Sequence, residues 1–447
     1  MTKTSNLFSK KQILLLIFPL IIEQFLALTI GLFDSLMVSG LGEEAVSGVS
    51  LVDTINYLFH GIFSALCTGG AIIFSQYIGH EENDNASLAA KQLISISLAI
   101  STLIGIIFIL FNSPILTLLY SNAEESVLNE CRTYFFWTAL SYPAIALYNA
   151  GAALFRAKGD SKTSMIISLI MNVLNIIFNA VFIYGFKMGV AGAAIGTLIS
   201  RSIAAILILS LFINRKDAIS IKGVKQYFPN FKMIKTILHI GIPSGIESSV
   251  FQIGKILIQG VVTYIGTIAI AAHSIANTIG SLTLIPATAI GLAMITVVGQ
   301  CSGANQKEQA RRYSLQLLSL SCLATILCAL LLFLTLDLIL PFYKMTPETL
   351  ELTKDILKIY FFFSPMFWSV AFVTPHALRA AGDVKFTLCV SLLSMWIFRV
   401  CCSYLFVYTF DMGIHGVWLA MYADWIARAA FFLPRVLGRK WQEHKII

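Results

Sequence analysis

Twelve long apolar segments dominate this sequence and limit what the chain can fold into. Each is about as long as a helix that crosses the hydrocarbon core of a bilayer, which needs roughly 20 residues. Hydrophobic residues make up 57% of the 447 residues and charged residues only 12%, about half the charged fraction of a soluble domain. This composition excludes a water-soluble enzyme and predicts an all-α integral membrane protein. The twelve predicted transmembrane helices cover residues 13–36, 47–78, 88–112, 133–153, 163–186, 190–213, 236–260, 268–299, 313–340, 357–377, 385–409 and 413–434.

The unequal distribution of basic residues predicts how these spans are oriented. If the N-terminus is cytoplasmic, most Lys and Arg residues fall in cytoplasmic loops, as membrane proteins favour. The net charge of +8 therefore reflects membrane orientation. We expect the lipid bilayer, and no nucleic acid, as a partner. The prediction is a multi-pass protein of the cell inner (plasma) membrane with both termini in the cytoplasm.

An internal repeat divides the sequence near its midpoint. Pro19 and Glu23 recur 224 residues later as Pro243 and Glu247, and the segment FRAKGD returns as LRAAGD. Other pairs keep the same spacing, namely Gly42 and Gly266, Gln76 and Gln300, Gly79 and Gly303, and Ala86 and Ala310. Because each half holds an even number of spans, both halves share one orientation. Their pseudo-twofold axis is then expected to run along the membrane normal.

The repeat also predicts the domain organisation. We expect an N-terminal six-helix bundle over 1–213, a cytoplasmic linker over 214–235 and a C-terminal six-helix bundle over 236–447. Parallel repeats of this kind are typical of transporters, whose binding sites lie where the repeats meet. The sequence contains no GxxxxGK[ST] loop for phosphate and no HExxH metal motif. We therefore expect transport driven by an ion gradient, with no enzymatic activity and no cofactor besides the coupling ion.

Several segments follow one another along the two halves in a distinctive order. They are FPLIIEQ, FDSLMVSGLG, LFRAKGDSK and NVLNIIFNAVFIYGFKMGVAGAAIGTLIS, then GIPSGIESSVFQIGKILIQ, VGQCSGANQKEQARR, ALRAAGD and MWIFRV. In these segments the chain resembles the multidrug and toxic compound extrusion (MATE) transporters, and the resemblance covers nearly the whole chain. It implies two six-helix bundles in a V that export organic cations or other amphipaths in exchange for Na⁺ or H⁺.

Asp34 is the first candidate for the coupling ion. A charge within a span costs about 2.5–3.5 kcal/mol on insertion scales, so such residues invite a functional interpretation. The resemblance implies that an acid here forms the cation-coupling site of the N-terminal bundle. Asn172, Asn175 and Asn179 share one face of the fifth span. A carboxylate with the amide oxygens of Asn175 and Asn179 can bind Na⁺, and a low-dielectric site also favours a protonated carboxyl. Alternatively, Asp34 lies at the headgroup boundary and the two asparagines join helices.

Three further charged residues are candidates for the substrate cavity, together with Asn172. Glu23 and Glu247 are repeat mates that each follow a proline by four residues, where the proline leaves a backbone carbonyl unpaired. They either line the floor of the cavity or bond to a neighbouring helix as protonated acids. Lys255 is the repeat mate of Gly31, one turn from Asp34. It either neutralises Asp34, binds an anionic group of the substrate, or snorkels to the outer surface.

The C-terminal half departs from one branch of the family. That branch has an acid eight residues after the proline of the seventh span, where this chain has Phe251, and another in the tenth span, which here has none. We therefore expect no ion site in the C-terminal bundle. Asp424 and Arg428 are spaced to form an ion pair within one helix, and Arg399 is interpreted as a packing or interfacial residue.

Together these features predict a secondary active antiporter that works by alternating access. It would export small amphipathic, mostly cationic organic compounds in exchange for H⁺ or Na⁺. Na⁺ at Asp34 is the one possible bound metal. We expect the transporter to act as a monomer. The alternative is a superfamily-related flippase or exporter of a lipid-linked or anionic metabolite, for which Lys255 is the only support.

Overall fold

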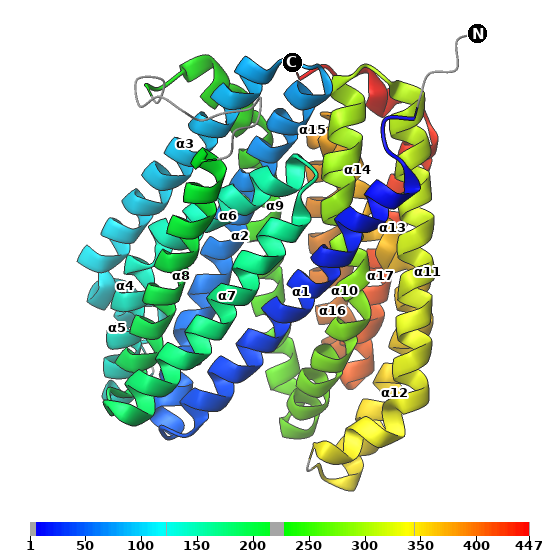
Figure 1. Ribbon diagram of the computed structural model, residues 1–447. Coiled ribbons are helices and arrows are strands. Elements are labelled where there is room, and N and C mark those ends of the chain that lie inside the picture. Colours follow the sequence, from blue (N-terminus) through cyan, green and yellow to red (C-terminus); the bar gives the residue numbers. More distant parts are fainter. Residues whose placement is uncertain (1–5, 122, 215–227, 344, 447) are drawn as a thin grey trace. The chain divides into compact units, whose positions relative to one another are not determined.

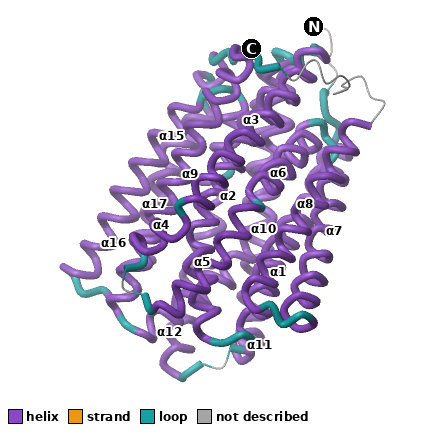
Figure 2. Tube along the Cα trace, turned by 90° about the vertical axis from the view of Figure 1, so that its left-hand side faces the viewer, coloured by secondary structure: helices purple, strands orange, loops and turns teal. Residues whose placement is uncertain are grey.

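The computed structural model describes residues 6–121, 123–214, 228–343 and 345–446. Throughout these residues the regular secondary structure is helical, as Figure 2 shows. The first half contains α1 (Lys10–Ser39), α2 (Glu43–Gly79), α3 (Asn83–Leu110), α4 (Asn112–Leu119), α5 (Glu125–Leu140), α6 (Tyr142–Ala157), α7 (Ser161–Ala180), the π-helix η1 (Val181–Gly185) and α8 (Gly189–Asn214).

The second half repeats this order with more interruptions (Figure 1). It contains α9 (Phe231–Ile265), α10 (Thr267–Gly303), α11 (Lys307–Ile339), η3 (Leu340–Phe342), α12 (Pro347–Phe363), η4 (Ser364–Trp368), α13 (Ser369–Phe372), α14 (Thr374–Ala380), α15 (Val384–Leu393), η5 (Ser394–Cys401), α16 (Cys402–Tyr404), η6 (Leu405–Thr409), α17 (Gly413–Leu437) and η7 (Lys440–Glu443). Of these, η4, η5 and η6 are π-helical.

Within the described residues, ten helices are long and apolar enough to cross a membrane. They match ten of the twelve predicted spans, and the other two predicted spans are also helical. The fourth, predicted over 133–153, is divided at Ser141 into α5 and α6, because Pro143 begins a new helix there. The twelfth corresponds to α17, which is more polar because it carries Asp424 and Arg428. The prediction of an all-helical membrane protein is confirmed.

The chain divides into two compact units. One, which we call the N-terminal unit, comprises Lys11–Gly245. The other, which we call the C-terminal unit, comprises Met1–Lys10 with Ile246–Ile447. The division falls inside α9, whereas the polar segment 214–235 before α9 predicts the bundle boundary. Most of that predicted linker lies outside the described residues.

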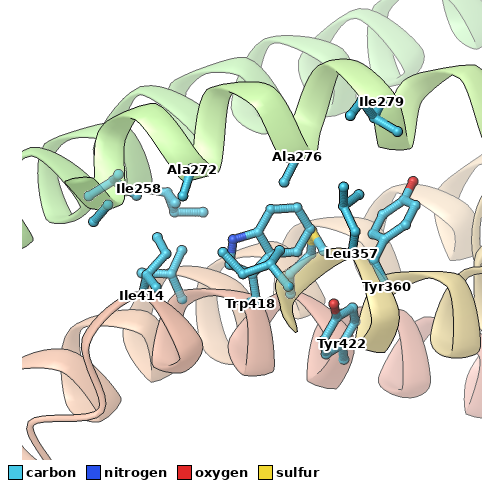
Figure 3. Close-up of a cluster of buried hydrophobic side chains, with 14 of the residues drawn as sticks. Ile258, Ala272, Ala276, Ile279, Leu357, Tyr360, Ile414, Trp418 and Tyr422 are labelled. Atoms are coloured by element: carbon cyan, nitrogen blue, oxygen red, sulfur yellow. The ribbon is translucent and has the colours of Figure 1, made fainter. Parts of the chain in front are cut away.

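The C-terminal unit is built around an aromatic core. Figure 3 shows the indole of Trp418 between α10, which carries Ala272 and Ala276, and the α17 segment that carries Tyr422. The ring of Tyr360, from α12, lies 5.8 Å from that of Trp418 in an edge-to-face contact. Such contacts stabilise beyond the area that they bury.

Both ends of the described chain are tied to the start of α11. The backbone N–H of Leu7 donates to Oε1 of Gln309, 2.9 Å away. From the other end, Nε2 of Gln442 donates to the carbonyl of Lys307 at 2.8 Å. The two described ends therefore meet at the same end of the C-terminal unit.

Candidate functional site

Asp34 lies near the end of α1 and is held by α7. Nδ2 of Asn179 donates to Oδ1 of Asp34 at 2.8 Å and is also 3.3 Å from Oδ1 of Asn175. The position of α7 is fixed at its start by Asp160, whose carboxylate accepts a hydrogen bond from the backbone N–H of Thr163. The structure thus brings Asp34, Asn175 and Asn179 together within the N-terminal unit.

Helix α8 supplies the next contacts of these asparagines. Nδ2 of Asn175 donates to the hydroxyl of Thr197 at 3.0 Å. Both asparagine side chains are almost fully buried. A Cβ atom at Gly196 would collide with Oδ1 of Asn179 and come within 2.9 Å of its backbone nitrogen. The close approach of α8 to Asn179 therefore requires glycine at 196.

A second carboxylate, Asp53 on α2, belongs to the same unit. Its Oδ1 accepts hydrogen bonds from Nδ2 of Asn56 at 3.1 Å and from the hydroxyl of Tyr134 at 3.4 Å. Oδ1 of Asn56 in turn accepts a hydrogen bond from Tyr142 at 2.9 Å. The carboxylate of Asp53 therefore has two hydrogen-bond donors from within the unit.

Arg201 on α8 connects the two acids electrostatically. Its guanidinium charge acts on both Asp34 and Asp53, while its NH1 donates to the hydroxyl of Ser141 at 2.8 Å. With both carboxylates ionised and Arg201 charged, the group carries one net negative charge, which one bound cation would neutralise. We call Asp34, Asp53, Asn175, Asn179 and Arg201 the N-terminal acidic cluster. Nothing in the sequence pattern of α8 indicated this role for Arg201.

Glu23 takes part in a separate ion pair on the same unit. NH1 of Arg156 donates to its Oε1 at 2.8 Å, and the hydroxyl of Ser164 donates to Oε2, also at 2.8 Å. The sequence left Glu23 either at the floor of the cavity or bonded to a neighbouring helix, and its carboxyl is held between α6 and α7. Arg156 falls between the predicted spans 133–153 and 163–186, so the sequence pattern did not indicate this contact.

Glu247 makes the corresponding contacts in the C-terminal unit. NH1 of Arg379 donates to its Oε2 at 3.1 Å, and the hydroxyl of Ser391 donates to its Oε1 at 2.7 Å. Each half therefore pairs its glutamate with an arginine and a serine hydroxyl, although Ser391 lies 227 residues after Ser164 and is not its repeat mate. The signal was available in the sequence, because Arg156 and Arg379 recur with nearly the same spacing as the two glutamates.

The two remaining candidates have fewer contacts. Asn172 is buried on the same face of α7 as Asn175, and its Nδ2 has no hydrogen-bond partner among the residues described. Lys255 lies on α9 in the C-terminal unit with an exposed side chain. Its charge acts on His273, as does that of Arg399.

A comparison with known protein families matches both halves of the chain. The sequence profile of the MatE family matches residues 19–181 and again residues 243–405, which together cover most of the chain. This chain belongs to the MatE family. Membership makes it a membrane transporter rather than an enzyme, and the two profile matches confirm the internal repeat.

Relatives of known name span nearly the same length as this MatE protein. It is 26% identical to the probable multidrug resistance protein NorM of Thermotoga maritima, over 98% of this chain and 94% of that protein. It is 25% identical to the uncharacterized transporter YisQ of Bacillus subtilis, over 98% and 95% of the two chains.

Solved structures show the same fold. A crystal structure of MATE in complex with MaD3S superposes with a TM-score of 0.88 at 22% identity, covering 96% of this chain and 97% of the other. At this level of identity the likeness shows the fold alone. The predicted family and its architecture are therefore confirmed, while the assigned site residues remain predictions.

Proposed function

We propose that this MatE protein is a secondary active antiporter that exports amphipathic, mostly cationic organic compounds in exchange for H⁺ or Na⁺. The observation that carries the proposal is the N-terminal acidic cluster. Asp34 faces Asn179 inside a membrane span, and Asp53 shares with it the single positive charge of Arg201. A site with one excess negative charge in a low-dielectric environment favours binding of one monovalent cation.

The same cluster can bind either ion. A proton would bind directly to the carboxylate of Asp34, which accepts a hydrogen bond from Asn179 in the arrangement described. Na⁺ would require the Asn179 amide to turn, so that Oδ1 replaces Nδ2 beside the carboxylate. That oxygen is buried and has no partner among the described residues, and carbonyl and carboxylate oxygens are the ligands that hard cations prefer.

Coupling follows from reciprocal linkage. If the ion binds better to the outward-open state and the substrate better to the inward-open state, each ligand lowers the affinity for the other by the same factor. Ion entry then drives substrate release without a direct contact between the two ligands. Asp34 is the ion-binding residue in this scheme, with Asn175 and Asn179 as its partners.

The proposed cargo is supported by the name of a relative, and the proposed location is supported by the charges of the loops. A relative of nearly equal length is named as a probable multidrug resistance protein, and the excess of basic residues in one set of loops supports cytoplasmic termini in the plasma membrane. The meeting of both described ends at the start of α11 is consistent with that orientation. We further propose that the transporter acts as a monomer.

The experiment is ethidium efflux from proteoliposomes with Na⁺ and pH gradients imposed separately. We expect one gradient to accelerate efflux severalfold and the other to have no effect, and this result would identify the coupling ion. Efflux at the same rate under both gradients and without a gradient would contradict antiport. Transport of a lipid-linked saccharide or an anionic metabolite, with no ethidium efflux, would favour the alternative function.

A further inference from the structure

The C-terminal repeat carries a positive charge where the N-terminal repeat carries a predicted ion ligand. The two MatE repeats begin 224 residues apart. At that spacing the mate of Asp34 is Ile258, and the mate of Asn175 is Arg399. The C-terminal counterpart of the acidic cluster therefore lacks the carboxylate and has a guanidinium group in place of an amide.

Arg399 shares one buried carboxylate with Arg428. NH1 of Arg399 lies 3.4 Å from Oδ2 of Asp424, and Nε of Arg428 lies 2.8 Å from Oδ1 of Asp424. The hydroxyl of Ser394 also donates to Oδ1. The side chains of Asp424, Arg428 and Arg399 are only 0%, 3% and 13% exposed. Both oxygens of the carboxylate are thus occupied from within the C-terminal unit. We call Arg399, Asp424 and Arg428 the C-terminal triad.

Aromatic rings cover the two guanidinium groups. The ring centroid of Phe251 lies 5.4 Å from the guanidinium carbon of Arg399 and 5.8 Å from that of Arg428. The ring of Phe372 lies 4.9 Å from Arg428 on α17. Because the face of an aromatic ring attracts a cation, these rings help to accommodate two positive charges beside one carboxylate. The triad therefore already holds two cations, and both are side chains.

The triad is connected to another acid that is paired within the same unit. NH2 of Arg428 donates to the carbonyl of Ser391 at 3.2 Å, and the hydroxyl of Ser391 donates to Glu247. Glu247 forms its ion pair with Arg379. Both of these acids thus have an arginine within hydrogen-bonding distance. Asp34, in contrast, accepts its hydrogen bond from the neutral amide of Asn179.

The N-terminal acidic cluster and the C-terminal triad therefore differ in net charge. When all groups are ionised, the cluster combines two carboxylates with one guanidinium group, which leaves one negative charge. The triad combines one carboxylate with two guanidinium groups, which leaves one positive charge. Charges interact strongly in low-dielectric surroundings. A mobile monovalent cation is therefore attracted to the cluster and repelled by the triad.

We propose that the C-terminal triad takes the place of a coupling ion in its half of the transporter, so that each transport cycle carries one monovalent ion. Arg399 and Arg428 are positioning residues in this scheme, because they occupy Asp424 and exclude a mobile ion from it. A cation that is part of the chain cannot be released in any state of the cycle. The inference rests on the proposed antiport and adds to it the residues that set the ion stoichiometry.

The first test compares two variants of the full chain in detergent. Arg399→Met with Arg428→Met leaves Asp424 buried without a cation, and the further change Asp424→Leu gives a charge-free variant as the matched control. Buried ion triads can be replaced by apolar residues with little loss of stability, whereas a buried carboxylate without a partner is costly when it is ionised. Only the variant that keeps Asp424 should be stabilised by a proton or by Na⁺. We expect its melting temperature to rise by several degrees on acidification, or on exchange of choline for Na⁺, relative to the charge-free variant.

The second test measures the ion stoichiometry in proteoliposomes with the membrane potential clamped at zero. The ethidium concentration ratio at which net flux stops should follow the first power of the imposed ion ratio in the wild type. The charge-free variant should show the same dependence, because the triad binds no mobile ion. The variant that keeps Asp424 without its arginines should approach the second power, because it offers a second ion site.

Several results would overturn the proposal. A second-power dependence in the wild type would show that another ion is carried, and this measurement needs no variant to fold. Equal responses of the two variants to pH and to Na⁺ would show that the arginines do not keep an ion from Asp424. Loss of ion-driven efflux in a charge-free variant that melts like the wild type would make the triad part of the ion site. Absence of ion-driven efflux in the wild type would instead contradict the proposed antiport, and the melting comparison would still test the triad.

Discussion

Replacing Gly196 with alanine tests how closely α7 and α8 must pack around the acidic cluster. The added Cβ would collide with Oδ1 of Asn179, lie 2.9 Å from the backbone nitrogen of Asn179 and lie 3.1 Å from the backbone carbonyl carbon of Phe178. The side-chain collision can be relieved by rotating Asn179, which breaks its 2.8 Å hydrogen bond to Asp34. The backbone contacts can be relieved only by moving α7 and α8 apart.

The losses exceed the gain from a better helix former. Overpacking costs about 1–3 kcal/mol, and loss of a hydrogen bond to a charged group costs about 1.5–3 kcal/mol. Alanine recovers only about 1 kcal/mol of helix propensity relative to glycine. We therefore expect Gly196→Ala to lower the melting temperature in detergent and to reduce gradient-driven ethidium efflux in proteoliposomes at least tenfold.

Two other glycines provide matched controls. A Cβ at Gly31, one turn from Asp34 on α1, or at Gly185, the last residue of η1, would meet no atom within 4 Å. Gly31→Ala and Gly185→Ala should retain wild-type stability and efflux. Wild-type melting and efflux in Gly196→Ala would refute the packing argument, and equal damage in all three variants would show that the effect is not local.

Two further substitutions probe contacts that the structure describes. Thr197→Val removes the hydroxyl that accepts the hydrogen bond of Asn175 and should destabilise the protein by about 1–3 kcal/mol. Thr197→Ser keeps a hydroxyl and should leave the stability unchanged. Thermal melting of the two variants distinguishes them. Glu247→Ala leaves the part-buried Arg379 without its ion-pair partner and should cost about 3–5 kcal/mol. Exchanging the two residues, as Glu247→Arg with Arg379→Glu, should recover part of that loss, whereas a double variant as unstable as Glu247→Ala would contradict a direct pairing.

The spans were predictable because lipid imposes a simple rule. A helix satisfies every backbone hydrogen bond internally, so an apolar run of sufficient length in a bilayer must be helical. The breaks were less predictable. Ser141 interrupts an apolar run, and only Pro143 signals the new helix. Hydropathy and helical periodicity do not distinguish the π-helical segment η5, which carries Arg399, from the α-helix around it.

Side-chain partners between distant helices were the least predictable feature. The spacing of Asn172, Asn175 and Asn179 indicated one face of a helix, but which helix that face meets depends on packing. Arg156 falls between the predicted spans 133–153 and 163–186, yet it pairs with Glu23, 133 residues away. Such pairs require tertiary structure, except where an internal repeat doubles the evidence, as it does for Glu247 and Arg379.

The most direct test of the account compares two kinds of transport in Asp34→Asn proteoliposomes. Gradient-driven ethidium efflux requires the coupling ion, whereas exchange of labelled for unlabelled ethidium requires only substrate binding and alternating access. If Asp34 binds the ion, the variant should lose gradient-driven efflux and retain exchange. Full gradient-driven efflux by Asp34→Asn would contradict the assignment of the coupling site to the N-terminal acidic cluster.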